Sequence, residues 1–506
     1  MSSIKQATLQ IENKCAWIAV ALLFKSLYFI FFARQFSSYE GGIWGVYAVD
    51  TSGYIVPFED LFTNGQFSEI LGLPGYGVLY LILRFFFNQI ISLNAITVIQ
   101  LIFSSLSVYY IAYTSYLIFN SRVLFYISYI IYLISTYVSV FDIYLLTESF
   151  ATSSLIFALY FYTKYFLDGK RFSLLLSGLL ITWGIILRAV FLPLLALFVF
   201  YLFINGINRP PRSIHVKSFA PILLYILPFI LFETFWLSYN FNRYHQFVPL
   251  QKHFYSLHLT RDELSISLVE FLKSWGGDFV YWNPSAEIVW FQYLESVTYK
   301  IGKELIEKIS FPKYIYTSKF DYDDLVQLRL RILSATSSGG SLTYKKLQYN
   351  LCAMKLREYT SSIKREKPIV YYVYAPLRLF WKFLFHSGTY NLLNKPFKEL
   401  NHFALIFKIV MSSLYIFIVL GGLFGGILLV CRNLQGFKLR LVLALIPFYF
   451  IFAHAFVLRC IEYRYFVPAY PFMVVLSSYV CWFSFDFIRR SYRTIICCSI
   501  FRQGVP

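Results

Sequence analysis

Residues 94–118 read NAITVIQLIFSSLSVYYIAYTSYLI and contain no acidic or basic side chain. A helix of about 20 such residues crosses the roughly 30 Å hydrocarbon core of a bilayer. Comparable apolar stretches recur along the 506-residue chain, which is 58% hydrophobic and only 14% charged. Ordinary globular domains are about 25% charged. The sequence therefore predicts an all-α integral membrane protein that crosses the membrane many times.

Ten stretches are long and apolar enough to be predicted as spans. They cover residues 16–33, 94–118, 123–141, 149–167, 173–188, 190–205, 218–238, 403–431, 440–458 and 465–485. The first follows two lysines in the manner of a signal sequence, but no small-x-small cleavage site comes after it, and we expect it to stay as an anchor. The fold class is thus an all-α polytopic membrane protein with about ten transmembrane helices.

The Lys and Arg residues indicate which side each loop faces, because cytoplasmic loops carry the basic excess. With the N-terminus inside, the short loops predicted to be cytoplasmic, such as 168–172 and 206–217, are basic and almost free of acids. The first outer segment, 34–93, instead has five acids against two bases. Within it, residues 74–92 resemble a span, but Arg84 lies at their centre, and counting them would place the basic loops outside. We predict a helix at the membrane interface there.

The spans and loops divide the chain into three parts. Residues 1–238 form an N-terminal transmembrane module, which includes the outer segment 34–93. Residues 239–401 form a large extracytoplasmic loop region with interfacial helices, one of them within 367–386. Residues 402–506 hold the C-terminal transmembrane helices and a cytoplasmic tail.

The composition also bears on partners and cofactors. The net charge of +19 is explained by basic cytoplasmic loops and by attraction to anionic lipids, and no basic tract is long enough to require a nucleic acid. We therefore expect membrane lipids as partners and no nucleic acid. The seven cysteines form no CxxC pair, and the acidic group at Asp321, Asp323 and Asp324 lacks the loop glycine of a calcium site. No metal site is predicted, and a need for a divalent metal stays open.

Polar residues recur at the predicted outer ends of the spans. They are Asp50, Tyr54, Glu59 and Asp60 in the first outer loop, Tyr76 in a Pro-Gly-Tyr-Gly turn, Glu148 in a Thr-Glu pair, Arg188 near Pro193, Asn240 and Arg243 before a Phe-Val-Pro, and Arg459, Glu462 and Arg464 before a later one. The predicted orientation places all of them on one face of the membrane, although they are far apart in the chain. A single site would require such a shared face.

In this order the motifs resemble those of the GT-C superfamily, specifically the family 39-like glycosyltransferases related to dolichyl-phosphate-mannose–protein mannosyltransferases and bacterial lipid A aminoarabinose transferases. The resemblance covers about 45–250 and 440–475 and leaves most of 251–400 unmatched. It implies a mannosyltransferase-like hexosyltransferase that moves a sugar from a polyprenyl-phosphate donor to a lipid, glycan or protein acceptor of the cell envelope. The site would lie on the extracytoplasmic side of the bacterial inner or plasma membrane, or of the endoplasmic reticulum membrane in a eukaryote.

The sequence departs from this pattern at three points. Many relatives have Asp-Glu in the first loop, where this chain has Asp50-Thr51. Arg188 is followed by Ala189 where many relatives have proline directly. The Lys-Pro-Pro of the aminoarabinose branch is absent, and that donor is therefore disfavoured.

Elementary chemistry explains why such a reaction needs these residue types. A hydroxyl acceptor is a poor nucleophile near pH 7, and a carboxylate must take its proton as it attacks the sugar carbon. By position the resemblance makes Asp50 this base, with Glu148 as the second candidate. Guanidinium groups bind the departing anionic phosphate, which makes Arg243, Arg459 and Arg464 its predicted ligands. The other polar residues above are predicted to bind substrate, and a single displacement of this kind inverts the anomeric centre.

Each residue also has a purely structural explanation. Asp50 is of a type that often forms turns, and Glu148 suits the first turn of a span, where the helix dipole favours an acid. Arg188 at a helix end can extend to the interface. Glu462 and Arg464 can simply pair with each other.

Two other functions stay open as well. One is a transporter or flippase for lipid-linked sugars, and the other is an inactive scaffold of the same fold. Transporters usually show internal repeats and charges at mid-membrane. This chain shows no repeat and concentrates its acids at one predicted surface, so we favour the enzyme.

Overall fold

The computed structural model describes residues 13–35, 40–68, 72–207, 219–245, 247–250, 263–280, 285–291, 309–337, 342–389, 393, 395, 397–433 and 438–502. Within them the chain consists of helices and connecting loops, with two isolated β-bridges. The chain divides into two compact units. Unit 1 comprises residues 1–252, 386–449 and 466–506, and unit 2 comprises residues 253–385 and 450–465.

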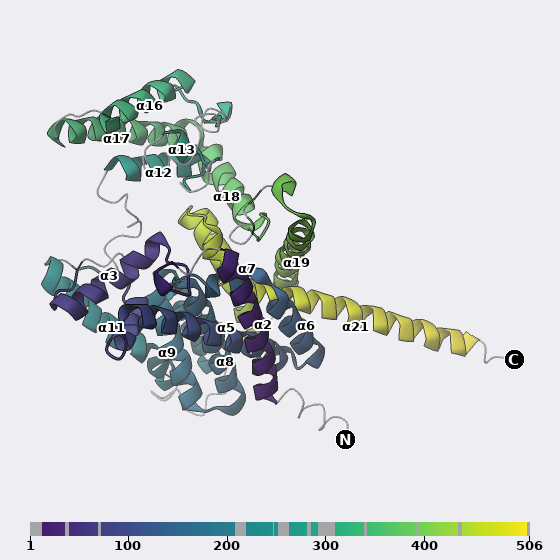
Figure 1. Cartoon of the computed structure of the whole chain (residues 1–506). Coiled ribbons are helices and arrows are strands. Elements are labelled where there is room, and N and C mark those ends of the chain that lie inside the picture. The colour runs from purple at the N-terminus through teal and green to yellow at the C-terminus, as the bar shows by residue number, and fades with distance from the viewer. Residues whose placement is uncertain are drawn as a thin grey trace. The chain divides into compact units, whose positions relative to one another are not determined.

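Unit 1 contains the long apolar helices (Figure 1). Its helices are α2 (Lys14–Gln35), α3 (Val49–Asn64), α4 (Gly75–Arg84), α5 (Gln89–Phe119), α6 (Arg122–Ile134), α7 (Thr136–Ser139), α8 (Glu148–Asp168), α9 (Arg171–Leu187), α10 (Leu192–Ile207), α11 (Ala220–Tyr244), α19 (His402–Arg432), α20 (Leu439–Phe452, in this unit up to Tyr449) and α21 (Tyr470–Arg502). Helix α5 packs on α2, α6 and α8, while α8 packs on α9 and α19 packs on α21. Two of these five pairs, α5 with α6 and α8 with α9, join helices that follow one another in the chain, and the other three join helices that are further apart.

Each of the ten predicted spans lies on a helix, and the all-α polytopic fold class is confirmed. Among the described residues, seven helices are long and apolar enough to cross a membrane, or eight if α6 and α7 count as one span bent by 48°. The other two predicted spans fall on α8 and α9. Helix α9 has 17 residues, at the short end of the range that crosses the hydrocarbon core, and the first half of α8 is rich in serine and threonine. The number of membrane crossings therefore depends on how these two shorter or more polar helices are counted.

The helix predicted over residues 74–92 is corrected by the structure. Helix α4 ends at Arg84, and α5 begins at Gln89. The Asn88 side chain accepts a hydrogen bond from the backbone of Ile91 at 2.9 Å and so caps the start of α5. Hydropathy alone does not predict such a cap, because the cap depends on one polar side chain. The cap divides one apolar stretch between two helices.

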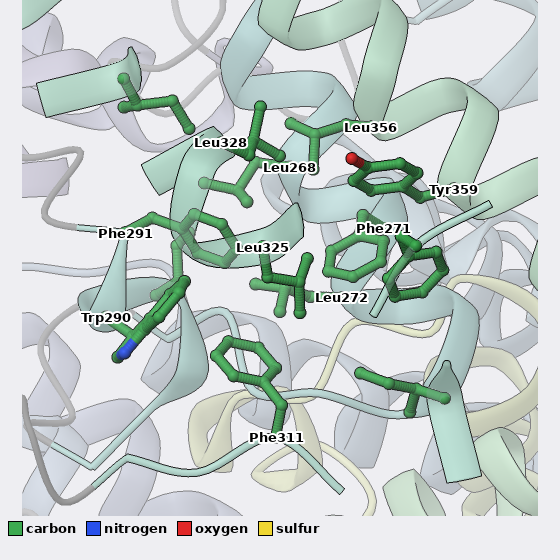
Figure 2. Packing of buried hydrophobic residues seen from close by; sticks show 14 of the residues in the cluster. Leu268, Phe271, Leu272, Trp290, Phe291, Phe311, Leu325, Leu328, Leu356 and Tyr359 are labelled. Carbon is green, nitrogen blue, oxygen red and sulfur yellow. The ribbon is translucent and has the colours of Figure 1, made fainter. Parts of the chain in front are cut away.

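Unit 2 is a smaller helical unit built around one hydrophobic core (Figure 2). Its elements are α12 (Glu263–Trp275), α13 (Glu287–Trp290), α16 (Tyr322–Ser337), α17 (Leu342–Glu366), the π-helical turn η6 (Val370–Tyr374), α18 (Ala375–Leu384) and the π-helical turn η8 (Ala453–Val457). Helices α12 and α16 both pack on α17. Phe271 from α12, Leu325 from α16 and Tyr359 from α17 meet in the core, where the Tyr359 ring stacks on Phe320 at 4.5 Å.

An ion pair joins α13 to α18 within unit 2. Arg378 contacts a Glu287 oxygen at 3.0 Å, and the other Glu287 oxygen accepts from the Asp278 amide at 2.7 Å. The same guanidinium donates to the Tyr314 hydroxyl at 2.9 Å and lies 5.2 Å from the Trp275 ring centroid. Arg378 is therefore directed into the unit, and it fixes one side of α18.

A buried ion pair lies inside unit 1. Lys25, near the middle of α2, contacts Asp142 at 2.9 Å, and their side chains are 1% and 2% exposed. Ser104 and Ser139 also accept from the ammonium group, the latter at 3.2 Å. Ser149, the second residue of α8, donates to the other Asp142 oxygen at 2.6 Å. The network thus joins α2, α5 and the start of α8.

We expect Lys25→Met to lower the free energy of unfolding by about 3–5 kcal/mol, because it leaves the buried Asp142 carboxylate without its cation. The double variant Lys25→Met/Asp142→Leu should recover most of that loss, since no charge then lacks a partner. Thermal unfolding of the detergent-solubilised protein measures both. Equal losses in the single and double variants would show that the pairing of charges is not what stabilises this region.

Candidate functional site

The segment between α2 and α3, predicted as part of the first outer loop, is fixed to the segment that precedes α8. The Val46 amide donates to the Ile143 carbonyl at 2.8 Å, and the Leu145 amide donates back to the Val46 carbonyl at 3.1 Å. The Thr51 hydroxyl, in the first turn of α3, donates to the Leu145 carbonyl at 2.9 Å. Asp50 precedes Thr51 in that turn. The helix start that carries Asp50 is therefore held on the segment that leads to Glu148.

Both predicted catalytic acids occupy the first turn of a helix. Asp50 lies in the first turn of α3 and is partly exposed, whereas Glu148 is the first residue of α8 and is 1% exposed. Helix N-termini stabilise negative charge through the helix dipole and their unpaired amides. The two acids therefore share the same local position at a helix start, and Asp50 is the one that solvent can reach.

Arg188 forms an ion pair with Glu148. A guanidinium nitrogen lies 2.7 Å from a Glu148 oxygen, and the side chains are 12% and 2% exposed. Arg188 follows α9 in extended conformation, and the short helix η3 (Ala189–Phe191) begins directly after it. This break in the helix directs the guanidinium toward the start of α8, and two predicted site residues meet there.

Tyr54 and Tyr76 extend this group to α3 and α4. Their ring centroids are 5.8 Å apart, and the Tyr76 hydroxyl donates to Gln100 at 2.7 Å. Burial raises the pKa of Tyr76, and the nearby negative charge of Glu148 raises it further. Tyr76 is therefore a neutral hydrogen-bond donor beside the carboxylate.

Glu59, a predicted substrate ligand, is bound by two residues of α4. Arg84 contacts both carboxylate oxygens, at 2.9 and 3.0 Å, and the Tyr80 hydroxyl donates to the same group. Burial raises the pKa of Glu59, but these hydrogen bonds outweigh it and hold the pKa below its ordinary value. The pair explains how an arginine is accommodated in an apolar stretch. Asp60, next in the chain, is partly exposed.

Asn240 holds the Phe-Val-Pro segment against α11. Its side chain donates to the Val248 carbonyl at 2.9 Å and is 3% exposed. Two residues later, the Leu250 amide donates to Glu233 at 2.9 Å, and the Leu250 carbonyl accepts from Trp236. Asn240 thus fixes the chain as it leaves the helix.

Arg243 lies near the exposed end of α11. Its guanidinium donates to the Phe67 carbonyl at 2.9 Å and to the Tyr239 hydroxyl at 2.8 Å. The Phe67 ring also packs on Phe58 of α3 at 5.1 Å. These contacts connect Arg243 to the helix that carries Asp50.

The remaining predicted residues belong to unit 2. Arg459 donates to the Tyr371 carbonyl at 2.8 Å, and its guanidinium lies 4.3 Å from the Tyr371 ring centroid. It adopts the left-handed backbone conformation, with φ of 49°. Glu462 forms an ion pair with Arg464 and accepts from the Tyr465 hydroxyl at 3.0 Å. The pairing of Glu462 with Arg464 that the sequence allows is present.

Three polar residues of unit 1 were missed in the sequence. Lys25 and Asp142 form the buried pair. The Gln100 side chain accepts a hydrogen bond from the Tyr76 hydroxyl and donates one to the Tyr144 carbonyl at 2.9 Å. Lys25 could have been recognised from the sequence, because a charged side chain inside an apolar span is energetically costly and is often functional. Nothing in the sequence indicated its partner.

The glycines of the Pro-Gly-Tyr-Gly motif allow close packing of α4. A β-carbon at Gly77 would lie 2.0 Å from the Phe58 ring and 2.7 Å from the Tyr54 carbonyl oxygen, and one at Gly75 would lie 2.9 Å from the Ile186 carbonyl group. Helix α4 therefore approaches both α3 and the end of α9. The motif thus lets Tyr76 lie near Glu148 of the Glu148–Arg188 pair.

Comparisons with known proteins show a distant similarity to a solved structure. No family model and no curated protein matches the chain. Among solved structures, it is similar to the crystal structure of the Archaeoglobus fulgidus oligosaccharyltransferase in the apo form, with 11% identity and a TM-score of 0.42. The match covers 96% of this chain and 52% of that one, so this chain spans about half the length of the structure it matches. A likeness this distant assigns neither a family nor an activity.

We expect Gly77→Ala to destabilise unit 1 by about 1–3 kcal/mol, the usual cost of overpacking a tight contact. The Phe58 ring can turn away, but the Tyr54 carbonyl belongs to the backbone of α3 and resists displacement. Val78→Ala is the matched control, because Val78 is 44% exposed on the same helix, and its cost should stay within about 0.5 kcal/mol. Thermal unfolding compares the two variants, and equal stability would contradict the close approach.

Proposed function

We propose that this protein is a membrane glycosyltransferase, which moves a sugar from a polyprenyl-phosphate donor to an acceptor on the extracytoplasmic side. The observation that carries the proposal is the attachment of two acid-bearing helix starts to each other. The backbone of Val46, just before Asp50, is hydrogen-bonded to the segment 143–145, which leads to Glu148. Both acids belong to the ordered motifs that resemble the family 39-like GT-C enzymes. The proposal joins that resemblance to this geometry.

In the proposed reaction, the Asp50 carboxylate accepts the proton of the acceptor hydroxyl as the hydroxyl oxygen attacks the anomeric carbon. The bond from that carbon to the phosphate oxygen breaks, and the polyprenyl phosphate leaves with the electron pair. The new bond forms on the opposite face of the sugar, so the configuration inverts. A positioned base of this kind contributes about 10²–10⁴-fold to the rate.

We assign positioning roles to the more buried members of the group. Arg188 holds the Glu148 carboxylate at 2.7 Å, and the buried Tyr76 hydroxyl is held by Gln100. Tyr54 is partly exposed, and we propose that it contacts the substrate. Such a division is common in active sites, where buried side chains orient the groups that reach the substrate.

For the phosphate of the donor we favour Arg243. Its side chain is exposed, and its guanidinium already donates hydrogen bonds to a carbonyl and to a hydroxyl group. Arg459 is packed on Tyr371, and Arg464 is paired with Glu462. These two stay candidates, but they are less exposed than Arg243. Guanidinium groups bind phosphate through paired, charge-assisted hydrogen bonds.

One observation favours a second candidate function, the transport of a lipid-linked sugar. The Lys25–Asp142 pair is buried, and Lys25 lies within an apolar helix. Intramembrane charges of this kind often mark transport pathways. The two functions separate in liposomes: an enzyme releases polyprenyl phosphate from its donor, whereas a flippase moves the intact lipid between leaflets.

We expect Asp50→Asn to reduce sugar transfer by at least about 100-fold, because an amide cannot accept the proton. Release of polyprenyl phosphate from radiolabelled polyprenyl-phosphate mannose, by purified protein in liposomes with membrane extract as acceptor, measures this loss. Asp168→Asn is the matched control: Asp168 is exposed at the far end of α8, and its loss should leave the rate unchanged. Full activity of Asp50→Asn would exclude Asp50 as the base.

The Glu148–Arg188 pair allows function and stability to be separated. Arg188→Gln should lower the unfolding temperature, because it leaves a buried carboxylate without its cation. Adding Glu148→Gln should restore stability, since both groups are then neutral. If the pair also serves catalysis, the stable double variant should stay at least about 10-fold slower in the transfer assay. If the double variant recovers both its unfolding temperature and its transfer rate, the role of the pair is structural alone.

A further inference from the structure

The segment formed by η6 and α18 has two different faces. Ala375, Leu379 and Phe383 are buried in unit 2, and the Phe383 ring lies 5.6 Å from His454. The outer face carries a row of large apolar side chains that are between 50% and 74% exposed. This outer stripe consists of Ile369, Tyr372, Val373, Leu377 and Trp381. One side of the segment thus packs on its own unit and the other does not.

The outer stripe is continuous along the helix axis. Its members are spaced by three or four residues or are adjacent, so they follow one another along the segment, over about 18 Å at 1.5 Å per residue. Water-soluble surfaces rarely expose a continuous row of this kind, and such rows mark sites of contact with proteins or membranes. We therefore expect the outer stripe to be covered by another molecule.

The charges around the stripe favour an anionic membrane surface. Residues 361–386 contain five basic residues and a single acid, Glu366. Arg378 is directed into unit 2 by Glu287, but Lys364 is exposed before the stripe and Lys382 lies beside its last member. Basic residues that flank an apolar face suit the negative headgroups of a lipid leaflet.

The aromatic content of the stripe indicates the same occupant. Tyr372 and Trp381 combine an apolar ring with a polar edge, and residues of both types gather at the boundary between lipid and water. The chain also proceeds from this segment to α19, a long apolar helix that begins at His402. A surface that binds a protein would not require this combination of interfacial aromatic residues, flanking lysines and an apolar helix that follows in the chain.

We propose that the outer stripe lies in the interfacial layer of the bilayer, with its apolar side chains among the acyl chains and Lys364 and Lys382 on anionic headgroups. Lipid then covers the face of α18 that unit 2 leaves exposed. The inference concerns the surface of unit 2 and holds whether or not the protein transfers sugar.

Site-specific photo-crosslinking of the full chain in lipid nanodiscs tests this. Benzoylphenylalanine is placed at Leu377 or Trp381, and at Leu330 of α16 as the matched control. Leu377 and Leu330 are the same residue type in the same unit, and they are 50% and 53% exposed. The proposal expects several times more lipid adduct at Leu377 and Trp381 than at Leu330.

The lipid composition then tests the role of the lysines. In nanodiscs of phosphatidylcholine and phosphatidylglycerol, adducts at Trp381 should be enriched in the anionic lipid, and Lys382→Gln should reduce that enrichment by up to about fivefold. Equal lipid adducts at Leu377, Trp381 and Leu330 would overturn the proposal. Crosslinks to another segment of the chain or to a second copy would overturn it as well, because a protein surface would then cover the stripe.

Discussion

The buried pair of Lys25 and Asp142 is the interaction on which the arrangement of unit 1 depends. Hydrocarbon does not solvate charge, so a lysine within an apolar helix has to meet an acid and further hydrogen-bonding groups. Asp142 supplies the charge, and Ser104 of α5 accepts another hydrogen bond. The second Asp142 oxygen accepts from Ser149. Few other positions of α2 against α5 and α8 would satisfy all of these groups.

This constraint shapes the irregular segment between α6 and α8. Buried backbone amides and carbonyls need hydrogen-bond partners from other protein groups. Here Val46 exchanges hydrogen bonds with Ile143 and Leu145, and the Gln100 side chain donates to the Tyr144 carbonyl. The groups that complete the hydrogen bonding of the segment therefore also bring the segment before α3 to the start of α8. The site residues and the buried pair share one framework.

The sequence predicted the helices better than their partners. Hydropathy placed each of the ten predicted spans on helices because each needs only a local apolar run, and seven or eight of them in the described residues are long and apolar enough to cross a membrane. Hydropathy did not predict the helix boundary at Asn88, where a single side-chain cap divides residues 74–92 between two helices. Hydropathy also did not predict unit 2, whose core joins residues as far apart in the chain as Phe271 and Tyr359. The charged motifs marked Glu148 and Arg188 as polar residues at helix ends. Their pairing depends on how α8 and α9 pack, which no local pattern records.

The observed pairings narrow the roles that the candidate residues can take. A carboxylate held 2.7 Å from a guanidinium, as Glu148 is by Arg188, must weaken that contact before it accepts a proton. Glu59 and Glu462 are bound in the same way by Arg84 and Arg464. Asp50 is the predicted base that lies at a helix start and is partly exposed. If the protein transfers sugar, we favour Asp50 as the base because a substrate can reach its partly exposed side chain, and the paired carboxylates serve better to hold the site in shape.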